Sequence, residues 1–111
     1  MGFWLELDQL MLTCPLVIDR PKGTTHPRYP DFIYPVDYGY LGETRSSDGH
    51  ELDIWVGTSD EEEIDAILCT VDPGKKDIEM KILYRCTEAE KQKILTVQNC
   101  VMKAILVRRG T

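Results

Sequence analysis

The chain has 111 residues, of which 42% are hydrophobic and 29% are charged, and its formal net charge is −6. This length suits one domain, and the composition excludes a disordered tail, a collagen-like repeat and a disulfide-stapled miniprotein. The negative charge also argues against a nucleic-acid partner. The longest apolar stretch, residues 10–18, is too short to cross a bilayer, and no basic segment precedes it. We therefore expect a single cytoplasmic domain over residues 1–111, without a membrane partner.

The first third of the chain predicts a helix, a strand and a long loop. Residues 3–12 have apolar positions at helical spacing, and the helix should end before Pro15. Residues 16–18 predict a brief buried strand. Residues 19–35 contain four of the six prolines together with several aromatic residues, which indicates an ordered loop.

From residue 36 onward the pattern is typical of β-strands. Residues 36–41 and residues 51–56 alternate apolar and polar side chains, and the Asp-Gly pair between them is a strong turn signal. Residues 64–71 and residues 78–84 predict two further strands about a second turn. These four segments therefore favour two hairpins.

The end of the chain predicts one helix and one strand. Thr87 and Glu90 have the spacing of a capping box, which opens a helix that runs to about Gln98. Residues 102–107 predict a final strand. Together the elements indicate a small α+β domain, in which an antiparallel, barrel-like sheet has one or two flanking helices.

The four cysteines are spread along the chain without a Cys-x-x-Cys pair, so their spacing does not predict a zinc site. The two histidines, His26 and His50, do not complete one. Each cysteine lies among apolar neighbours, and we expect buried free thiols.

The charges are distributed unevenly along the chain. Residues 31–79 contain 14 acidic and three basic residues, whereas the other 62 residues contain five acidic and ten basic ones. A cation site beside an anion site would produce this pattern, and so would ordinary solvated surfaces. The acidic run of residues 60–63 is interpreted as a solvated turn outside any site.

Two turns each carry a pair of aspartates five residues apart, Asp48 with Asp53 and Asp72 with Asp77. Carboxylates gathered at one end of a sheet would suit a hard divalent cation such as Mg²⁺, which prefers oxygen ligands. Aspartate is also common in turns because its side chain bonds to nearby backbone amides. The pairs alone leave both interpretations open.

A basic segment provides a further candidate site. Arg20, Lys22 and Arg28 lie near one another in residues 19–29. Such a group of cations can hold a phosphate, because guanidinium and ammonium groups both bind phosphate oxygens. It can equally be a basic surface loop.

Two motifs resemble the soluble family I inorganic pyrophosphatases. Residues 34–40 match that family's Tyr-Pro-x-x-Tyr-Gly-Tyr strand, and residues 48–53 are similar to its aspartate-rich turn. The spacing between the motifs also fits, and the likeness extends over about residues 16–84. The resemblance implies an OB-like five-stranded barrel with Mg²⁺ as the cofactor. It also implies hydrolysis of inorganic diphosphate to two phosphates by direct attack of a metal-activated water.

The resemblance implies roles for individual residues as well. The metal ligands would be five aspartates, namely Asp19, Asp48, Asp53, Asp72 and Asp77. The substrate phosphates would be bound by Lys22, Arg28, Tyr38 and Lys81. The catalytic residues would be His50, at the position of the attacking water, together with Tyr38 and Asp53.

The chain departs from the family pattern at several places. His50 stands where the family has an aspartate at the attacking water, and imidazole favours Mn²⁺ or Co²⁺ over Mg²⁺. Glu79 stands where the family has a phosphate-binding lysine, and Lys81, which faces the same way one pleat further on, can substitute for it. Only five residues separate Tyr29 from Pro35, so an arginine-bearing hairpin of the family is missing. The family's C-terminal Tyr-Lys element has no clear match.

Three functions are compatible with this pattern. The first is hydrolysis of inorganic diphosphate with fewer phosphate contacts. The second is hydrolysis of another phosphoanhydride, such as a nucleotide, because the missing hairpin would open the site. The third is a non-catalytic domain that binds phosphate or metal. An exposed sheet edge and aromatic residues such as Trp4 and Trp55 leave a homo-oligomer open.

Overall fold

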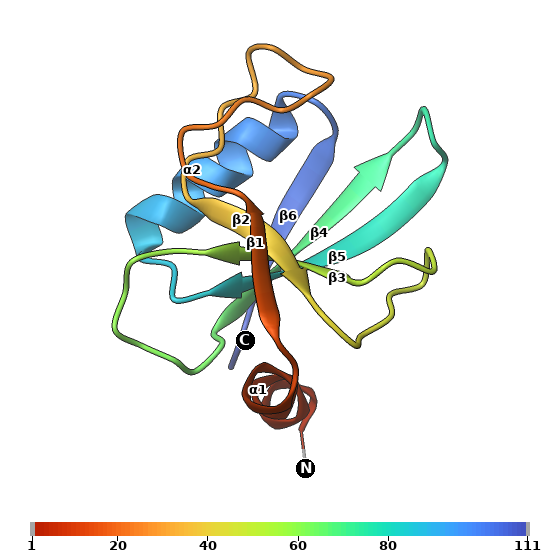
Figure 1. Ribbon diagram of the computed structural model, residues 1–111. Helices are drawn as coiled ribbons and strands as arrows, with labels where there is room; N and C mark the ends of the chain where they lie inside the picture. The colour runs from red at the N-terminus through yellow and green to blue at the C-terminus, as the bar shows by residue number, and fades with distance from the viewer. Residues whose placement is uncertain (1, 111) are drawn as a thin grey trace.

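Six strands form one mixed sheet in the order β1-β2-β3-β5-β4-β6 in the computed structural model, which describes residues 2–110 (Figure 1). Neighbouring strands are antiparallel except for β3 and β5, which are parallel. With two helices the protein has an α+β fold, as the sequence predicts. The strands are β1 (Leu16–Arg20), β2 (Asp37–Leu41), β3 (Leu52–Val56), β4 (Ala66–Asp72), β5 (Asp77–Tyr84) and β6 (Lys103–Arg108), and the helices are α1 (Phe3–Thr13) and α2 (Glu88–Asn99).

The sheet differs from the expected antiparallel barrel because it is open and contains a parallel pair. Within residues 2–110, β1 and β6 are the two edges and do not pair with each other. The adjacent residues Ile54 and Trp55 of β3 lie on opposite faces of the sheet, and both are fully buried. A closed barrel turns one face of each strand outward, whereas here each face carries an apolar core. Burial on both faces therefore favours the open sheet.

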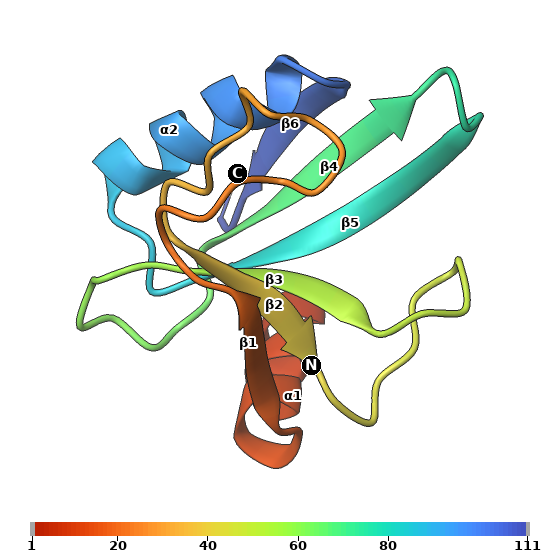
Figure 2. The same ribbon diagram turned by 45° about the horizontal axis from the view of Figure 1, so that its top comes forward.

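The two helices cover opposite faces of the sheet (Figure 2). Leu7 of α1 belongs to the same apolar core as Ile54 and Ile82. Ile94 of α2 belongs to the other core, together with Trp55. None of the helices in residues 2–110 is long and apolar enough to cross a membrane.

The loop of residues 21–36 shares the face of the sheet that α2 covers, and it lies beside this helix (Figure 1). Its side chains Phe32 and Tyr34 are buried in the core on that face. A β-bridge between Thr25 and Ile33 orders the middle of the loop. The ordered loop predicted from the prolines and aromatic residues is therefore confirmed.

Strands β1 and β2 approach each other closely at Gly39. A Cβ atom at this position would collide with the carbonyl oxygen of Val17, so a larger residue does not fit. A bulge in β1 then puts Arg20 opposite Tyr38. Arg20 lines a cavity on the α2 face, whereas Asp19 is exposed and does not.

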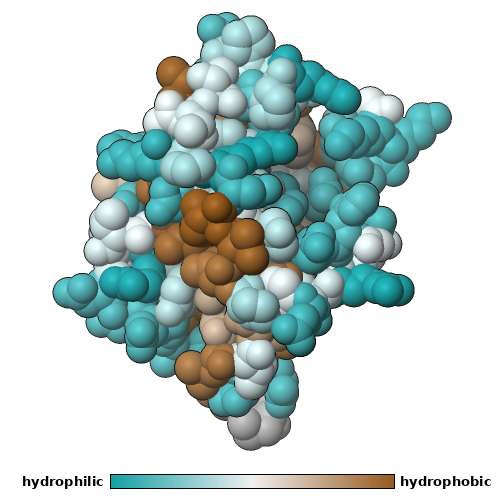
Figure 3. Space-filling model, in the orientation of Figure 1, coloured by the Kyte–Doolittle hydropathy of each residue, from teal (hydrophilic) through white to brown (hydrophobic). Residues whose placement is uncertain are grey.

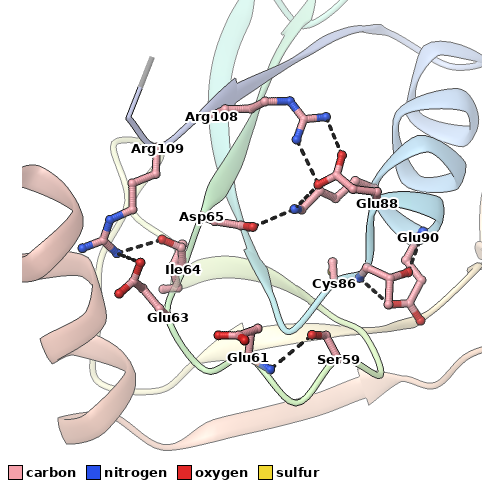
Figure 4. Close-up of polar contacts among 12 residues, drawn as sticks. Ser59, Glu61, Glu63, Ile64, Asp65, Cys86, Glu88, Glu90, Arg108 and Arg109 are labelled. Atoms are coloured by element: carbon pink, nitrogen blue, oxygen red, sulfur yellow. Dashed lines mark hydrogen bonds and ion pairs between the residues drawn. The ribbon is translucent and has the colours of Figure 1, made fainter.

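The start of α2 is tied to the sheet by charged side chains (Figure 4). The Nζ atom of Lys91 donates hydrogen bonds to Asp65 at 2.8 Å and to Glu88 at 2.6 Å, and the side chain of Lys91 is buried. Arg108 of β6 donates a hydrogen bond to the same Glu88 carboxylate at 3.0 Å. The capping box predicted at the start of this helix is also present. These contacts fix the helix against β4 and β6.

Two strands are less buried than their sequences predict. Strand β1 is an edge strand, and Leu16 and Val17 are 39% and 36% exposed, so the prediction of a buried strand here is wrong. Ile78 and Met80 of β5 are also exposed, because the β4–β5 hairpin extends beyond both helices (Figure 1). The apolar face of β5 is covered from Ile82 onward.

Burial corrects two expectations about individual side chains. All four cysteines are free, as predicted, but Cys100 is exposed and Cys86 alone is fully buried. Trp55 is completely buried and so offers no exposed aromatic ring for self-association. The acidic residues 60–63 are all exposed, as expected for a solvated turn.

Candidate active site

A cavity of about 180 Å³ opens on the α2 face, where the sheet emerges from beneath the helix and the loop of residues 21–36. Figure 3 shows the surface hollowed between this loop and the β4–β5 hairpin. Strands β1, β2, β3 and β5 supply its polar lining, together with the β4–β5 turn. The polar residues from these elements are Arg20, Tyr38, Asp53, Lys75, Glu79 and Lys81, and the loop and α2 add His26, Tyr29, Tyr34 and Gln98.

Lys81, Asp53 and Tyr38 form a hydrogen-bonded group in this cavity. Asp53 of β3 and Lys81 of β5 are register partners, so their side chains leave the same face of the sheet side by side. The Nζ atom of Lys81 donates hydrogen bonds to Asp53 Oδ2 at 2.8 Å and to the Tyr38 hydroxyl at 2.9 Å. An ammonium group has three N–H donors, so one remains for a ligand in the cavity.

The Tyr38 hydroxyl remains protonated at neutral pH. Burial raises its pKa well above the ordinary value, and the negative charge of Asp53 raises it further. The hydroxyl accepts a hydrogen bond from Lys81, and its own proton interacts with the Asp53 carboxylate. A phosphate oxygen in the cavity would compete with Asp53 for this proton.

Glu79 lies at the centre of the carboxylates on this face. Burial raises the pKa of Glu79, while the charge of Lys81 opposes the shift. Its carboxyl group shares a hydrogen bond with Asp48 and interacts electrostatically with Asp53 and Asp77. From the sequence, Glu79 was noted only as an acidic residue at the place where the family has a phosphate-binding lysine. Alternation along β5, which puts residues 77, 79 and 81 on one face, is the signal that could have identified it.

Cations surround the mouth of the cavity. Arg20 Nη1 donates a hydrogen bond to the Tyr34 hydroxyl at 2.7 Å, and this contact raises the pKa of Arg20. Lys75 comes from the β4–β5 turn and lines the same cavity. The pKa of His26 is lowered by burial first and then by Arg20, Arg28 and other cations. The mouth is therefore an electropositive region around a neutral imidazole.

The structure brings some of the predicted site residues together and leaves others outside. The cavity contains Tyr38, Asp53 and Lys81. Arg28 and Asp72 line an adjoining groove. Asp48 and Asp77 do not line either space, but both interact with Glu79. Lys75 and His26 line the site although the sequence did not assign them to it, and Arg20, which the sequence indicated only as part of the basic segment, lines it as well.

Three more predicted site residues, besides Asp48 and Asp77, line neither space, for local reasons. Asp19 lies at the β1 bulge. Lys22 is exposed in the loop, where its backbone N–H binds Asp37 at 2.9 Å. His50 is exposed in the β2–β3 connection, where its backbone N–H binds Asp48 Oδ1 at 2.9 Å. A side chain at the bulge or on an open turn is not directed by the pleat of a strand, so strand spacing does not predict its direction.

Hydrogen bonds within its turn hold Asp48. Its carboxylate accepts hydrogen bonds from Ser46 and from the backbone N–H of His50, and they lower the pKa of Asp48 to about 2. Asp72 is similarly engaged, because its Oδ1 atom accepts the backbone N–H groups of Gly74 and Lys75. Both aspartates therefore have the turn-forming role that the sequence pattern had left open.

The carboxylates fit a hard cation by their chemistry. Asp53, Asp77 and Glu79 offer oxygen ligands from one face of the sheet, since residues alternate between its faces. Within residues 2–110, no three His, Cys, Asp or Glu side chains gather into a metal cage. Mg²⁺ is commonly held by one or two carboxylates and completes its coordination with waters and substrate phosphates. The donor set therefore fits Mg²⁺ that is bound together with a phosphate ligand.

Comparison of the chain with models of protein families gives no match, and comparison with curated proteins gives none. The resemblance to family I pyrophosphatases therefore rests on the motifs themselves. What the structure adds is the arrangement around Tyr38, Asp53 and Lys81, the three assigned residues that meet in one cavity.

Proposed function

We propose that this protein is a metal-dependent phosphohydrolase related to the family I inorganic pyrophosphatases, with inorganic diphosphate as its simplest substrate. The observation that supports this most is the buried Lys81 ammonium group, which binds Asp53 and Tyr38 at the wall of a cavity with a cationic mouth. The cavity combines donors for phosphate oxygens with carboxylates for a cation. Phosphoryl transfer requires both kinds of group.

The donors in the cavity match a phosphate group. Lys81 retains one N–H, the Tyr38 hydroxyl can turn its proton from Asp53 to a phosphate oxygen, and Arg20 and Lys75 add positive charge at the mouth. Charge-assisted hydrogen bonds to phosphate are about twice as strong as neutral ones, and a partly buried site strengthens them further. These residues would bind the substrate phosphates and stabilise the charge that builds up on them during attack.

The carboxylates would hold the metal. Asp53 and Glu79, the two carboxylates that line the cavity, are the residues proposed to bind Mg²⁺ beside the phosphate. When bound, Mg²⁺ neutralises phosphate oxygens and lowers the pKa of a coordinated water. His50 does not line the cavity, so its position does not support a role as a metal ligand. The preference for Mn²⁺ or Co²⁺ that an imidazole ligand would cause is therefore not expected. We therefore propose Mg²⁺ as the preferred ion.

Phosphate release from inorganic diphosphate, measured with Mg²⁺, Mn²⁺ and Co²⁺ in turn, tests the proposal. We expect Mg²⁺-dependent turnover by the wild type and a loss of at least about 100-fold in Lys81→Met, the scale for removing one donor from a developing charge. Lys103→Met is the matched control, because Lys103 is an exposed lysine at the start of β6.

Asp53→Asn separates the two components of the site, because it removes one carboxylate charge while it keeps the shape of the side chain. We expect this variant to require more Mg²⁺ for half-maximal turnover. Diphosphate binding by the wild type without turnover under any metal would instead support a non-catalytic phosphate-binding domain.

A further inference from the structure

The cavity continues outward into a groove that is larger than a phosphate ligand requires. The groove has a volume of about 540 Å³ and shares Arg20, His26, Tyr29, Lys75 and Met102 with the inner cavity. The inner cavity, at about 180 Å³, is a third of that size, which suits a single phosphate group better than a larger ligand. The groove lies in the range of about 300–1,000 Å³ that is typical of sites for organic ligands.

Positive charge predominates where the groove meets the cavity. Arg20, Arg28 and Lys75 line the groove, and the acidic side chain that lines it is Asp72. The Oδ1 atom of Asp72 already accepts the backbone N–H groups of Gly74 and Lys75, so its charge is partly compensated by its own turn. The three cations can therefore meet a phosphate that extends outward from the inner cavity.

The rest of the groove wall consists of rings and apolar groups. The rings of His26 and Tyr29 lie with their centroids 5.0 Å apart at 45°, which gives a tilted pair. Pro27 and Met102 also line the groove. Tyr29 is 37% exposed, so part of its ring is accessible from the groove.

His26 is held as a neutral flat ring. Its Nδ1 atom accepts the backbone N–H of Arg28 at 3.0 Å, so the hydrogen of the neutral imidazole is on Nε2. Burial and the surrounding cations lower the pKa of His26, which keeps the ring neutral at physiological pH. A neutral ring beside Tyr29 can stack on a heteroaromatic base without adding to the positive charge of the groove.

We propose that the outer groove binds the organic part of a nucleotide, so that the phosphoanhydride hydrolysed is that of a nucleoside diphosphate or triphosphate. The base stacks on Tyr29 with its edge against His26, the cations hold the outer phosphate, and the inner cavity holds the terminal one. A longer inorganic polyphosphate would use the cations but leave the rings uncovered. This inference rests on the proposed function, because it assigns a substrate class to the same cavity.

Calorimetric titration with three non-hydrolysable probes in Mg²⁺ tests the inference. The probes are methylenediphosphonate, adenosine 5′-(α,β-methylene)diphosphate, and ribose 5-(α,β-methylene)diphosphate, which lacks the base. We expect the adenosine probe to bind at least about fivefold more tightly than the ribose probe, which is the lower end of base–aromatic stacking. Tyr29→Ala should bring this ratio close to one, whereas Tyr29→Phe, which keeps the ring, should preserve it.

The outcomes separate the inference from the function on which it rests. If methylenediphosphonate binds and the adenosine and ribose probes bind equally, the nucleotide inference is overturned and the phosphohydrolase proposal stands. If the ratio survives in Tyr29→Ala, the base lies elsewhere and the inference is also overturned. If none of the three probes binds, both proposals fail.

Discussion

Lys81 and Asp53 face each other across the parallel pair β3–β5, with 2.8 Å between Nζ and Oδ2. The Lys81 side chain is nearly buried, whereas the Asp53 side chain is 32% exposed. The buried cation is thus held by a partner that still reaches the cavity. Lys81 also lies 5.3 Å from the centre of the Tyr38 ring. The three residues come from three neighbouring strands, β2, β3 and β5, so the site is built on the middle of the sheet.

The Lys81–Asp53 pair should be energetically coupled. A hydrogen bond to a charged group contributes about 1.5–3 kcal/mol, and exposure of Asp53 to water reduces this. We expect a double-mutant cycle with Lys81→Met and Asp53→Asn, measured by urea unfolding, to give a coupling free energy of about 1 kcal/mol. Additive effects of the two substitutions would show that the contact does not stabilise the fold.

Tyr38 should contribute to substrate binding through its hydroxyl alone. Tyr38→Phe keeps the ring, which packs edge-on against Trp55 with centroids 4.7 Å apart, and removes one donor to phosphate. We expect kcat/KM for diphosphate to fall about five- to tenfold, which corresponds to one hydrogen bond of about 1 kcal/mol or slightly more. Tyr40→Phe, also on β2, is the control. Equal kinetics in wild type and Tyr38→Phe would remove the hydroxyl from the site.

Stability should decrease in acid because of Glu88. Hydrogen bonds from Arg108 first and then Lys91 lower the pKa of Glu88 to about 2, below its value in an unfolded chain. A carboxylate with a lowered pKa in the folded state stabilises that state above about pH 4.5, and this contribution disappears as the pH falls toward 2. We expect Glu88→Gln to lower Tm at pH 7 and to match the wild type near pH 2.

The control for this experiment is Glu62→Gln, an exposed glutamate in the acidic turn. Its Tm should equal that of the wild type at both pH values. If Glu88→Gln lowered Tm by the same amount at pH 7 and at pH 2, the ionised form of Glu88 would have no part in holding α2.

The acidic run of residues 60–63 should play no part in metal binding. All four side chains are exposed, none lines the cavity or the groove, and Glu63 interacts with Arg109 at 3.6 Å. We expect replacement of the four residues by serine to change the affinity for Mg²⁺, measured by calorimetry, less than twofold. A large loss, comparable to that of Asp53→Asn, would place the metal on the other side of the molecule.

His50 should have little influence on metal preference. It is exposed in the β2–β3 connection and lines neither the cavity nor the groove. We expect His50→Ala and His50→Asp to keep the Mg²⁺ to Mn²⁺ rate ratio of the wild type within about twofold. A clear gain in Mg²⁺-dependent turnover in His50→Asp would contradict this and would support the position at the attacking water that the resemblance implies for residue 50.

The local elements could be predicted from the sequence because each has its own physical signal. The capping box fixed the start of α2 at Thr87, and alternation gave the approximate extents of the strands. The order of the strands could not be predicted, because alternation does not show which strand will be the neighbour of β3. The parallel pair of β3 and β5 lies where both faces of the sheet are buried, and the helices that cover these faces come from other parts of the chain.

The site was predictable where its residues lie on regular strands and unpredictable elsewhere. Tyr38, Asp53 and Lys81 meet as expected, because the pleat directs them all to the α2 face. Arg20 replaced Asp19 at the cavity because of a bulge, which a single sequence does not reveal. Lys75 reaches the site from the β4–β5 turn, and the position of this turn depends on the order of the strands in the sheet.

Calorimetric titration of methylenediphosphonate into the wild type and Lys81→Met, both with Mg²⁺, tests most directly whether the cavity is a phosphate site. Loss of one charge-assisted hydrogen bond of about 1.5–3 kcal/mol corresponds to at least about a tenfold weaker Kd. We expect that loss in Lys81→Met, with Lys103→Met unchanged. Equal affinity in the wild type and in a folded Lys81→Met would contradict the assignment of this cavity.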